Sequence, residues 1–424
     1  MVDSERPPNA QTKNRKAQIT PRASDILITL SVMNTKRIRP GIEVLLNHRM
    51  DLLAGQRVGL VCNQATVLPD LRHAADVFYE HPEIDLTTLF GPQHGIRGDV
   101  QYNMIETPHM PDARTGIMVY SLYSETREPT EAMLADVDTI VVDLQDVGCR
   151  IYTFVYTMAN CMRAAKTFGK RVIVCDRPNP INGNDIDGNV TEDAFTSFVG
   201  QFALPTRHGM TIGELAKMFN EHFGIGCELE VVKMEGWRRE MWGDETGLPW
   251  VLPSPNIPDV DTCVVFPATV HLEGTELSEG RGTTLPFFLN GAPFIDAYAW
   301  AAELRKFDLP GVAFREAYFQ PTFCEFAGQT CGGVQIHITD RETFKPVITG
   351  IAMVKTAYEM YPDHFQWRQN AYEYEFDKNP FDVVAGTDKI RKAIESGAAL
   401  SEIENAWADE LNAFAEARKP YLLY

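Results

Sequence analysis

The sequence lacks three features that mark special classes of protein. It has no run of 18 consecutive apolar residues, so we expect no membrane-spanning helix. Its eight cysteines include no CxxC pair and several lie in apolar runs such as VIVCD, which predicts buried, reduced thiols. No long Lys/Arg tract occurs, and 39 basic against 58 acidic residues give a formal net charge of −19. This charge argues against a nucleic-acid partner and against insertion into or binding on an anionic membrane.

The remaining composition is that of an ordinary folded protein. The 424 residues are 44% apolar, 10% aromatic and 23% charged, which excludes collagen-like and wholly disordered classes. That length is enough for two domains, each with its own core. Residues 1–33 begin with a polar, proline-containing stretch (1–22) where a signal peptide needs an apolar segment, and their short apolar run Ile26–Met33 is too weak to export the chain. We interpret them as a disordered leader or as sequence upstream of a true start at Met33, and we expect a cytoplasmic protein.

Apolar β-rich runs alternate with helical patterns from residue 34 to about 190. The expected strands are Arg57–Cys62, Asp85–Phe90, Met118–Ser121, Thr139–Leu144 and Arg171–Cys175. The last two are almost continuously apolar, and the helical pattern Val155–Phe168 lies between them. Such runs are typical of a parallel sheet covered on both faces. The sequence therefore predicts an α/β fold with a Rossmann-like parallel-sheet domain over residues 34–190.

Residues 191–424 show no regular alternation, and we predict a smaller α+β domain there. The segment PNPINGNDIDGNVTED, rich in turn formers, marks the expected boundary. A T-x-x-E capping box at Thr211 and Glu214 predicts a helix start. We expect a short strand at Val264–Phe266, a β-rich segment at Gly333–Ile338 and helices near Thr349–Met360, Asp388–Ser396 and Leu400–Arg418.

Polar side chains cluster after three of the predicted strands. Ligands of such sheets bind beyond the carboxyl ends of the strands, so we expect these clusters to converge on one site. The cluster residues are Gln93, His94, Arg97, Asp143, Gln145, Asp146, Arg150, Tyr152, Asp176, Arg177 and Asn179. Purely structural roles stay open for some of them: the two aspartates at 143 and 146 could cap a helix, and the histidine could be a satisfied loop residue.

A fourth cluster, in the second half, holds Glu273, Glu279 and Arg281 in the run LEGTELSEGRGT. This run is not a phosphate-binding loop, and the sequence has no GxSxG, no HExxH and no zinc-ligand spacing. These absences predict no metal site and give no support for a bound nucleotide. The remaining inventory of carboxylates, arginines, amides and aromatics suits a sugar, because carboxylates can act on a glycosidic bond while amides and arginines bind hydroxyl groups.

The ordered motifs of this chain resemble those of the exo-β-N-acetylmuramidase family. They are LFGPQHGIRGD, VVDLQDVGCRIYTF, DRPNPING, HGMTIGELA, TGLPWVLPSPNIP, LEGTELSEGRGT, DVVAGTDKIR and KPYLLY, and they extend from near Gly41 to Tyr424. The resemblance implies a two-domain glycoside hydrolase without a cofactor. Its expected substrate is a peptidoglycan-derived saccharide or muropeptide, from whose non-reducing end it removes N-acetylmuramic acid.

On this interpretation Asp146 and Glu273 form the expected catalytic pair, one from each domain, with Asp143 and His94 as further acid or base candidates. The expected substrate-binding residues are Gln93, Arg97, Gln145, Arg150, Tyr152, Asp176, Arg177, Asn179, His208, Glu279 and Arg281. The arginines among them are candidates for the lactyl carboxylate of muramic acid.

One position departs from the family pattern. Many members have Glu in the third position of GPEHG, whereas this chain has Gln93, and an amide cannot transfer a proton at neutral pH. Two alternatives to the hydrolase therefore stay open. The chain could be a non-catalytic sugar-binding member, or it could hydrolyse another small anionic substrate. Convergence of the predicted carboxylates in one pocket would favour hydrolysis.

Overall fold

The computed structural model describes residues 37–424. The predicted leader, residues 1–33, lies outside the described residues.

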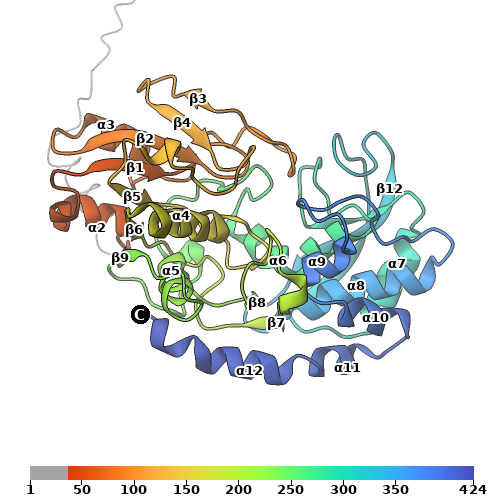
Figure 1. The fold of residues 1–424 in the computed structure, drawn as a ribbon. Coiled ribbons are helices and arrows are strands. Elements are labelled where there is room, and N and C mark those ends of the chain that lie inside the picture. Colours follow the sequence, from red (N-terminus) through yellow and green to blue (C-terminus); the bar gives the residue numbers. More distant parts are fainter. Residues whose placement is uncertain (1–36) are drawn as a thin grey trace, which may run out of the picture. The chain divides into compact units, whose positions relative to one another are not determined.

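Seven strands form the main sheet, in the order β3-β4-β2-β1-β5-β6-β9 (Figure 1). They are β1 Arg57–Val61, β2 Asp85–Gly91, β3 Met110–Pro111, β4 Met118–Ser121, β5 Thr139–Val142, β6 Arg171–Cys175 and β9 Glu228–Val232. Neighbours are parallel except β3 and β4. All five predicted strands are present, which confirms the α/β class. Along the chain, β1 is followed by β2 and β4 on one side of it and then by β5 on its other side. The strand order therefore reverses between β1 and β5.

Alternation along the central strands explains why helices cover both faces of this sheet. Ile140 and Val142 of β5 belong to the apolar cluster on one face, whereas Val141 belongs to the cluster on the other. Helices α2 (Gly41–His48) and α3 (Ala74–Glu80) pack on the second face. Helices α4 (Phe154–Phe168) and α5 (Ile212–Glu221) pack on the first (Figure 1).

Local signals set the ends of these helices as the sequence predicts. The Thr211 side chain accepts a hydrogen bond from Glu214 N and the Glu214 carboxylate accepts one from Thr211 N, which is the predicted capping box of α5. Helix α4 ends at Gly169, whose φ of 65° lies in the left-handed region that glycine adopts at least cost.

The second half contains a three-stranded antiparallel sheet and most of the remaining helices. Its main elements are α6 Val260–Thr269, β10 Leu289–Ala292, α7 Ala297–Arg305, β11 Val312–Phe319, β12 Cys331–Ile338, α8 Pro346–Met360, α9 Pro380–Ala385, α10 Lys389–Glu395, α11 Leu400–Asn405 and α12 Ala408–Ala417. The predicted strand at Val264–Phe266 is wrong: these residues lie inside α6. The Asp259 carboxylate accepts a hydrogen bond from Thr262 N and caps this helix, and burial on all sides gives its sequence no helical periodicity.

The two halves share one apolar core. A continuous cluster of buried side chains includes Val142 of β5, Phe154 of α4, Phe266 of α6 and Val354 of α8. The predicted domain boundary near residue 190 stays a prediction. Strand β9, which lies beyond that position, pairs with β6 in the main sheet.

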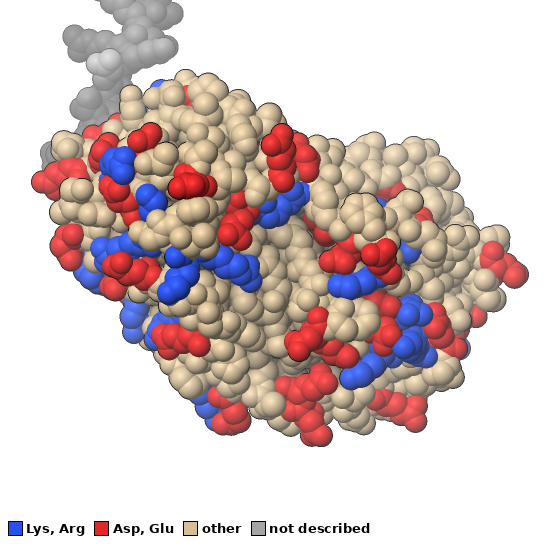
Figure 2. All heavy atoms as spheres, viewed as in Figure 1, with Lys and Arg blue, Asp and Glu red and all other residues tan. Residues whose placement is uncertain are grey.

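The surface and the thiols agree with the composition. On the face of residues 37–424 seen in Figure 2, Lys and Arg lie among Asp and Glu and form no continuous basic surface. All eight cysteines are free and seven are buried, as predicted. No helix in the described part of the chain is long and apolar enough to span a bilayer.

Candidate active site

A pocket opens between the carboxyl end of β2, the segment before α4, and several segments of the second half. It encloses about 500 Å³, including its open mouth. Five residues predicted from sequence line it: Gln93, His94, Tyr152, Glu273 and Arg281. Their neighbours in the lining are Asn103, Ile151, Thr153, Phe154, Val199, Ser254, Asn256, Ile257, Phe266, Phe287, Tyr372 and Glu373. The pocket thus combines apolar and aromatic walls with a few polar groups, as small-molecule sites do.

The side chain of Glu273 contacts a cation and two neutral hydrogen-bond donors. It lies in the 3₁₀ helix Val270–Gly274 that follows α6. Arg281 Nη2 lies 2.7 Å from Oε1, while Tyr372 OH donates to Oε2 at 2.5 Å and Asn103 Nδ2 donates to Oε2 at 3.3 Å. These contacts fix the orientation of the carboxyl group in the pocket.

A second carboxyl in the same pocket, Glu373, was not among the sequence candidates. Gln93 Nε2 donates to its Oε1 at 3.1 Å, and Tyr123 OH donates to its Oε2 at 2.7 Å. Burial raises the pKa of Glu373 to about 7, and the charge of Glu273 adds to this rise. Glu373 lies in the loop AYEYEF, which follows no predicted strand, so the strand-end rule used to find site residues did not reach it.

His94 lines the pocket as a neutral imidazole. Its Nδ1 lies 2.7 Å from the carbonyl oxygen of Val100, so Nδ1 carries the proton and Nε2 is left as an acceptor. Burial lowers the pKa of His94 to about 4. A neutral histidine of this kind is suited to accept a hydrogen bond from a sugar hydroxyl rather than to donate a proton to a leaving group.

Arg281 joins Glu273 to a further carboxyl, Glu279. Arg281 Nη1 donates to Glu279 Oε1, so the guanidinium lies between the two carboxyl groups. Burial raises the pKa of Glu279 to about 7, although Arg281 opposes this rise. Glu279 is not part of the pocket lining and contacts the pocket through Arg281.

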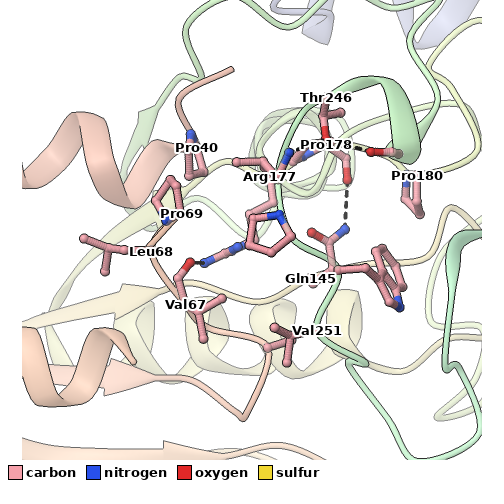
Figure 3. A pocket seen from close by; sticks show the side chains of 15 residues that line it. Pro40, Val67, Leu68, Pro69, Gln145, Arg177, Pro178, Pro180, Thr246 and Val251 are labelled. Atoms are coloured by element: carbon pink, nitrogen blue, oxygen red, sulfur yellow. Dashed lines mark hydrogen bonds between the residues drawn. The ribbon is translucent and has the colours of Figure 1, made fainter. Parts of the chain in front are cut away.

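Two predicted residues line a separate pocket beside the reversal of strand order, and a third, Asp143, pairs with one of them. Gln145 and Arg177 line it, and Gln145 Nε2 donates to the carbonyl of Pro178 at 2.9 Å (Figure 3). Arg177 Nη2 donates to the carbonyl of Val67 at 3.1 Å, and its Nε and Nη2 donate to the two oxygens of Asp143 at 2.5 and 2.7 Å. Asp143 is fully buried, and both of its carboxylate oxygens accept hydrogen bonds from Arg177.

The other predicted polar residues make structural contacts outside the first pocket. Asp146 Oδ2 accepts from Gly148 N at 2.8 Å and lies 3.3 Å from His208 Nε2. Arg150 Nη2 donates to the carbonyls of Val384 and Ala385.

Arg97 pairs with Asp112 at the surface. Asp176 accepts from Thr211 Oγ1, and Asn179 Nδ2 donates to the carbonyl of Met210. The predicted convergence of all strand-end clusters on one site therefore holds for Gln93, His94 and Tyr152 but not for the aspartates or for these arginines.

The pocket around Glu273 offers acid–base chemistry. It presents one carboxylate held by a cation and one buried carboxyl whose pKa is near neutrality, and such pairs are how glycosidases separate an acid from a base or nucleophile. Within residues 37–424 no group of three His, Cys, Asp or Glu side chains is placed to hold a metal ion.

Comparisons with known proteins agree with this chemistry. The family model described as exo-beta-N-acetylmuramidase NamZ, N-terminal, matches residues 58–261, and its C-terminal counterpart matches residues 264–424. The peptidoglycan beta-N-acetylmuramidase NamZ of Bacillus subtilis is 47% identical over 388 residues, which cover 92% of each chain.

Crystal structures of two DUF1343 family proteins from Bacteroides fragilis are similar in fold. The first has a TM-score of 0.82 at 37% identity and covers 92% of this chain and 100% of that one. The second has a TM-score of 0.72 at 28% identity and covers 91% and 99% of the two chains. The two family models together match most of the chain, and it belongs to the exo-β-N-acetylmuramidase family.

Proposed function

We propose that this protein is an exo-acting glycosidase that removes N-acetylmuramic acid from the non-reducing end of peptidoglycan fragments, with the pocket around Glu273 as its active site. Membership of the family and the 47% identity to the Bacillus subtilis enzyme support the reaction and the substrate class. The geometry of the pocket supports the location of the site.

The observation that carries this proposal is the environment of Glu273. Its carboxyl group is buried, and Arg281 and two neutral hydrogen-bond donors contact its two oxygens. A buried carboxylate aimed into a pocket with this support is suited to stabilise positive charge at the anomeric carbon, or to attack it. Tyr152 and Phe287 add apolar wall for the sugar ring.

The predicted partner of Glu273, Asp146, keeps its role only as a hypothesis. Among the four arginines predicted to meet the lactyl carboxylate, Arg281 lines the pocket, while Arg97, Arg150 and Arg177 make the contacts described above. We therefore assign recognition of the lactyl group to the part of the pocket near Arg281.

The test is a release assay with two disaccharides, read by mass spectrometry. One carries N-acetylmuramic acid at the non-reducing end and the other carries N-acetylglucosamine there. We expect release only from the first. We expect Glu273→Gln to lower kcat by roughly 10² or more, because it removes the charge and not the shape. Glu276→Gln, three residues further along and outside the pocket lining, is the matched control. Equal release from both disaccharides would contradict the proposed specificity.

The non-catalytic alternative rests on Gln93, and the same assay separates it from the hydrolase. A sugar-binding member would bind the first disaccharide and release nothing. The presence of Glu373 against the Gln93 amide means that the pocket keeps two carboxyls despite the substitution. This arrangement favours turnover.

A further inference from the structure

The loop that carries Glu373 is built to present this side chain to the pocket. Tyr372 and Glu375 exchange backbone hydrogen bonds around a two-residue turn, Glu373-Tyr374. Both central residues have positive φ, 45° and 69°, as a type I′ turn requires, although neither is glycine or asparagine. Non-glycine residues in this conformation carry a backbone cost that recurs at functional sites.

Contacts across the pocket hold this turn in place. Tyr372 OH donates to Glu273, Glu373 accepts from Gln93 and Tyr123, and Tyr374 OH donates to Glu106. The guanidinium of Arg127 lies 3.8 Å from the centre of the Tyr374 ring. Tyr372 therefore contacts the carboxyl of Glu273, and the next residue of the turn, Glu373, supplies the second carboxyl. Glu373 and Tyr374 also contact the first half of the chain.

We propose that Glu373 is the proton donor to the leaving sugar in the hydrolysis proposed above, on which this inference rests, and that Gln93 is the positioning residue that holds its carboxyl toward the pocket. Gln93 is itself oriented, because Thr153 Oγ1 donates to Gln93 Oε1 at 2.7 Å and so directs Nε2 to Glu373. Gln93 itself cannot transfer a proton. Its amide instead donates a hydrogen bond to the neighbouring carboxyl of Glu373, which can transfer one.

The two carboxyls of the pocket have environments that separate their roles. Glu273 contacts a guanidinium, whereas the hydrogen-bond donors to Glu373 are the neutral amide of Gln93 and the neutral phenol of Tyr123. The charged groups that act on Glu373 are Glu273, which raises its pKa, and Arg127, which lowers it. Burial outweighs both, and a carboxyl with a pKa of about 7 is protonated often enough at neutral pH to donate.

The proposed step balances in protons and electrons. The Glu373 proton moves to the glycosidic oxygen as the bond from this oxygen to the anomeric carbon breaks, and the bonding pair stays on the oxygen of the leaving sugar. Glu273 either bonds to the anomeric carbon or takes a proton from the attacking water. In the first case, Glu373 then accepts a proton from the water that hydrolyses the ester. The products in both cases are free N-acetylmuramic acid and a sugar with a new hydroxyl group.

The experiment compares two substrates that differ only in their need for a proton. The second sugar of the disaccharide leaves as an alkoxide unless its glycosidic oxygen is protonated, whereas 2,4-dinitrophenyl N-acetyl-β-muramide has a leaving group that needs no acid. We expect Glu373→Gln to lower kcat/KM on the disaccharide by roughly 10²–10⁴-fold and on the aryl glycoside by less than about tenfold. For the wild type we expect the rate to fall above about pH 7, and we expect the variant to lose this fall.

Controls keep the outcomes distinct. Glu375→Gln makes the same change two residues away in the same loop, where the side chain pairs with Lys378, and should leave both rates unchanged. Glu273→Gln should lower both rates together. If Glu373→Gln melts at a lower temperature than the wild type, Glu373→Asp serves instead, since it keeps a carboxyl and should keep the basic limb of the pH profile. Equal losses on the two substrates, or no loss on either, would overturn this assignment. Failure of the wild type on both substrates would overturn the proposed function instead.

Discussion

The side-chain amide of Gln93 donates a hydrogen bond to the carboxyl of Glu373 over 3.1 Å, although 280 positions of sequence separate the two residues. The contact joins the loop after β2 to the turn between α8 and α9. The amide of Gln93 thus holds a carboxyl that belongs to the other half of the chain.

Gln93→Glu should move the basic limb of the pH profile of kcat/KM to higher pH. The change places a second carboxyl against Glu373, and two carboxyls that share one proton hold it more tightly than either does alone. The measurement is kcat/KM on the disaccharide from pH 5 to 9. A large rise in turnover with no change in the profile would instead indicate that the wild-type chain lacks its catalytic acid.

Thr153→Val should lower kcat with little change in KM. Valine keeps the shape but removes the hydroxyl that orients the Gln93 amide, and we expect a loss of about tenfold from misplacement of Glu373. Thr153 makes no side-chain cap to α4, so the helix start is not weakened. Steady-state kinetics check this prediction, and a rise in KM alone would argue for a direct contact of Thr153 with the substrate.

Asp146→Asn separates the sequence-based hypothesis from the structural one. If Asp146 were a catalytic residue, its change to asparagine would lower kcat by roughly 10²-fold. Because the carboxylate contacts Gly148 N and His208, we expect a lower melting temperature and a rate within about tenfold of wild type. Calorimetry and the release assay on the same sample decide between these outcomes.

Asp143→Asn should destabilise the fold strongly. It removes the partner of a guanidinium that is almost fully buried, and breaking such a pair costs about 3–5 kcal/mol. Asp244→Asn, in an exposed pair with Arg341, should cost less than about 1 kcal/mol and is the control. Urea unfolding of both variants gives the two values, and similar costs would contradict the role of burial.

Asp176 should make stability fall as pH rises. Burial raises its pKa to about 7, with the Glu214 charge adding, so the folded chain binds a proton there that the unfolded chain releases near pH 4. Its contribution to stability is complete below about pH 4 and is lost as pH rises through about 7. We expect Asp176→Asn to flatten the melting temperature between pH 5 and 8. An unchanged slope would count against the raised pKa.

Short-range patterns predicted the sheet half well. The apolar runs of β5 and β6 and the capping box at Thr211 are local signals, and the structure confirms them. Strand β9 was missed because it lies at the sheet edge and carries charged residues. Helix α6 was mistaken for a strand because a helix buried on all sides shows no alternation between apolar and polar residues.

The site was harder to predict because its partners are distant in sequence. The strand-end rule found Gln93 and His94 and also selected Asp143 and Arg177, which pair with each other. In the sequence, an aspartate and an arginine that bind a ligand cannot be told from an aspartate and an arginine that pair with each other. Glu373 had no local signal, and contacts with residues distant in sequence, such as Gln93 and Tyr123, bring it to the pocket.

One apolar cluster runs from β5 and α4 into α6 and α8. The segments that the two family models match, residues 58–261 and 264–424, therefore depend on each other for folding. Neither segment can close its interior without side chains from the other, so we expect a single cooperative unfolding transition rather than two. A hybrid that joins the first segment of this chain to the second segment of a relative would therefore have to match the interior packing before it could form a pocket.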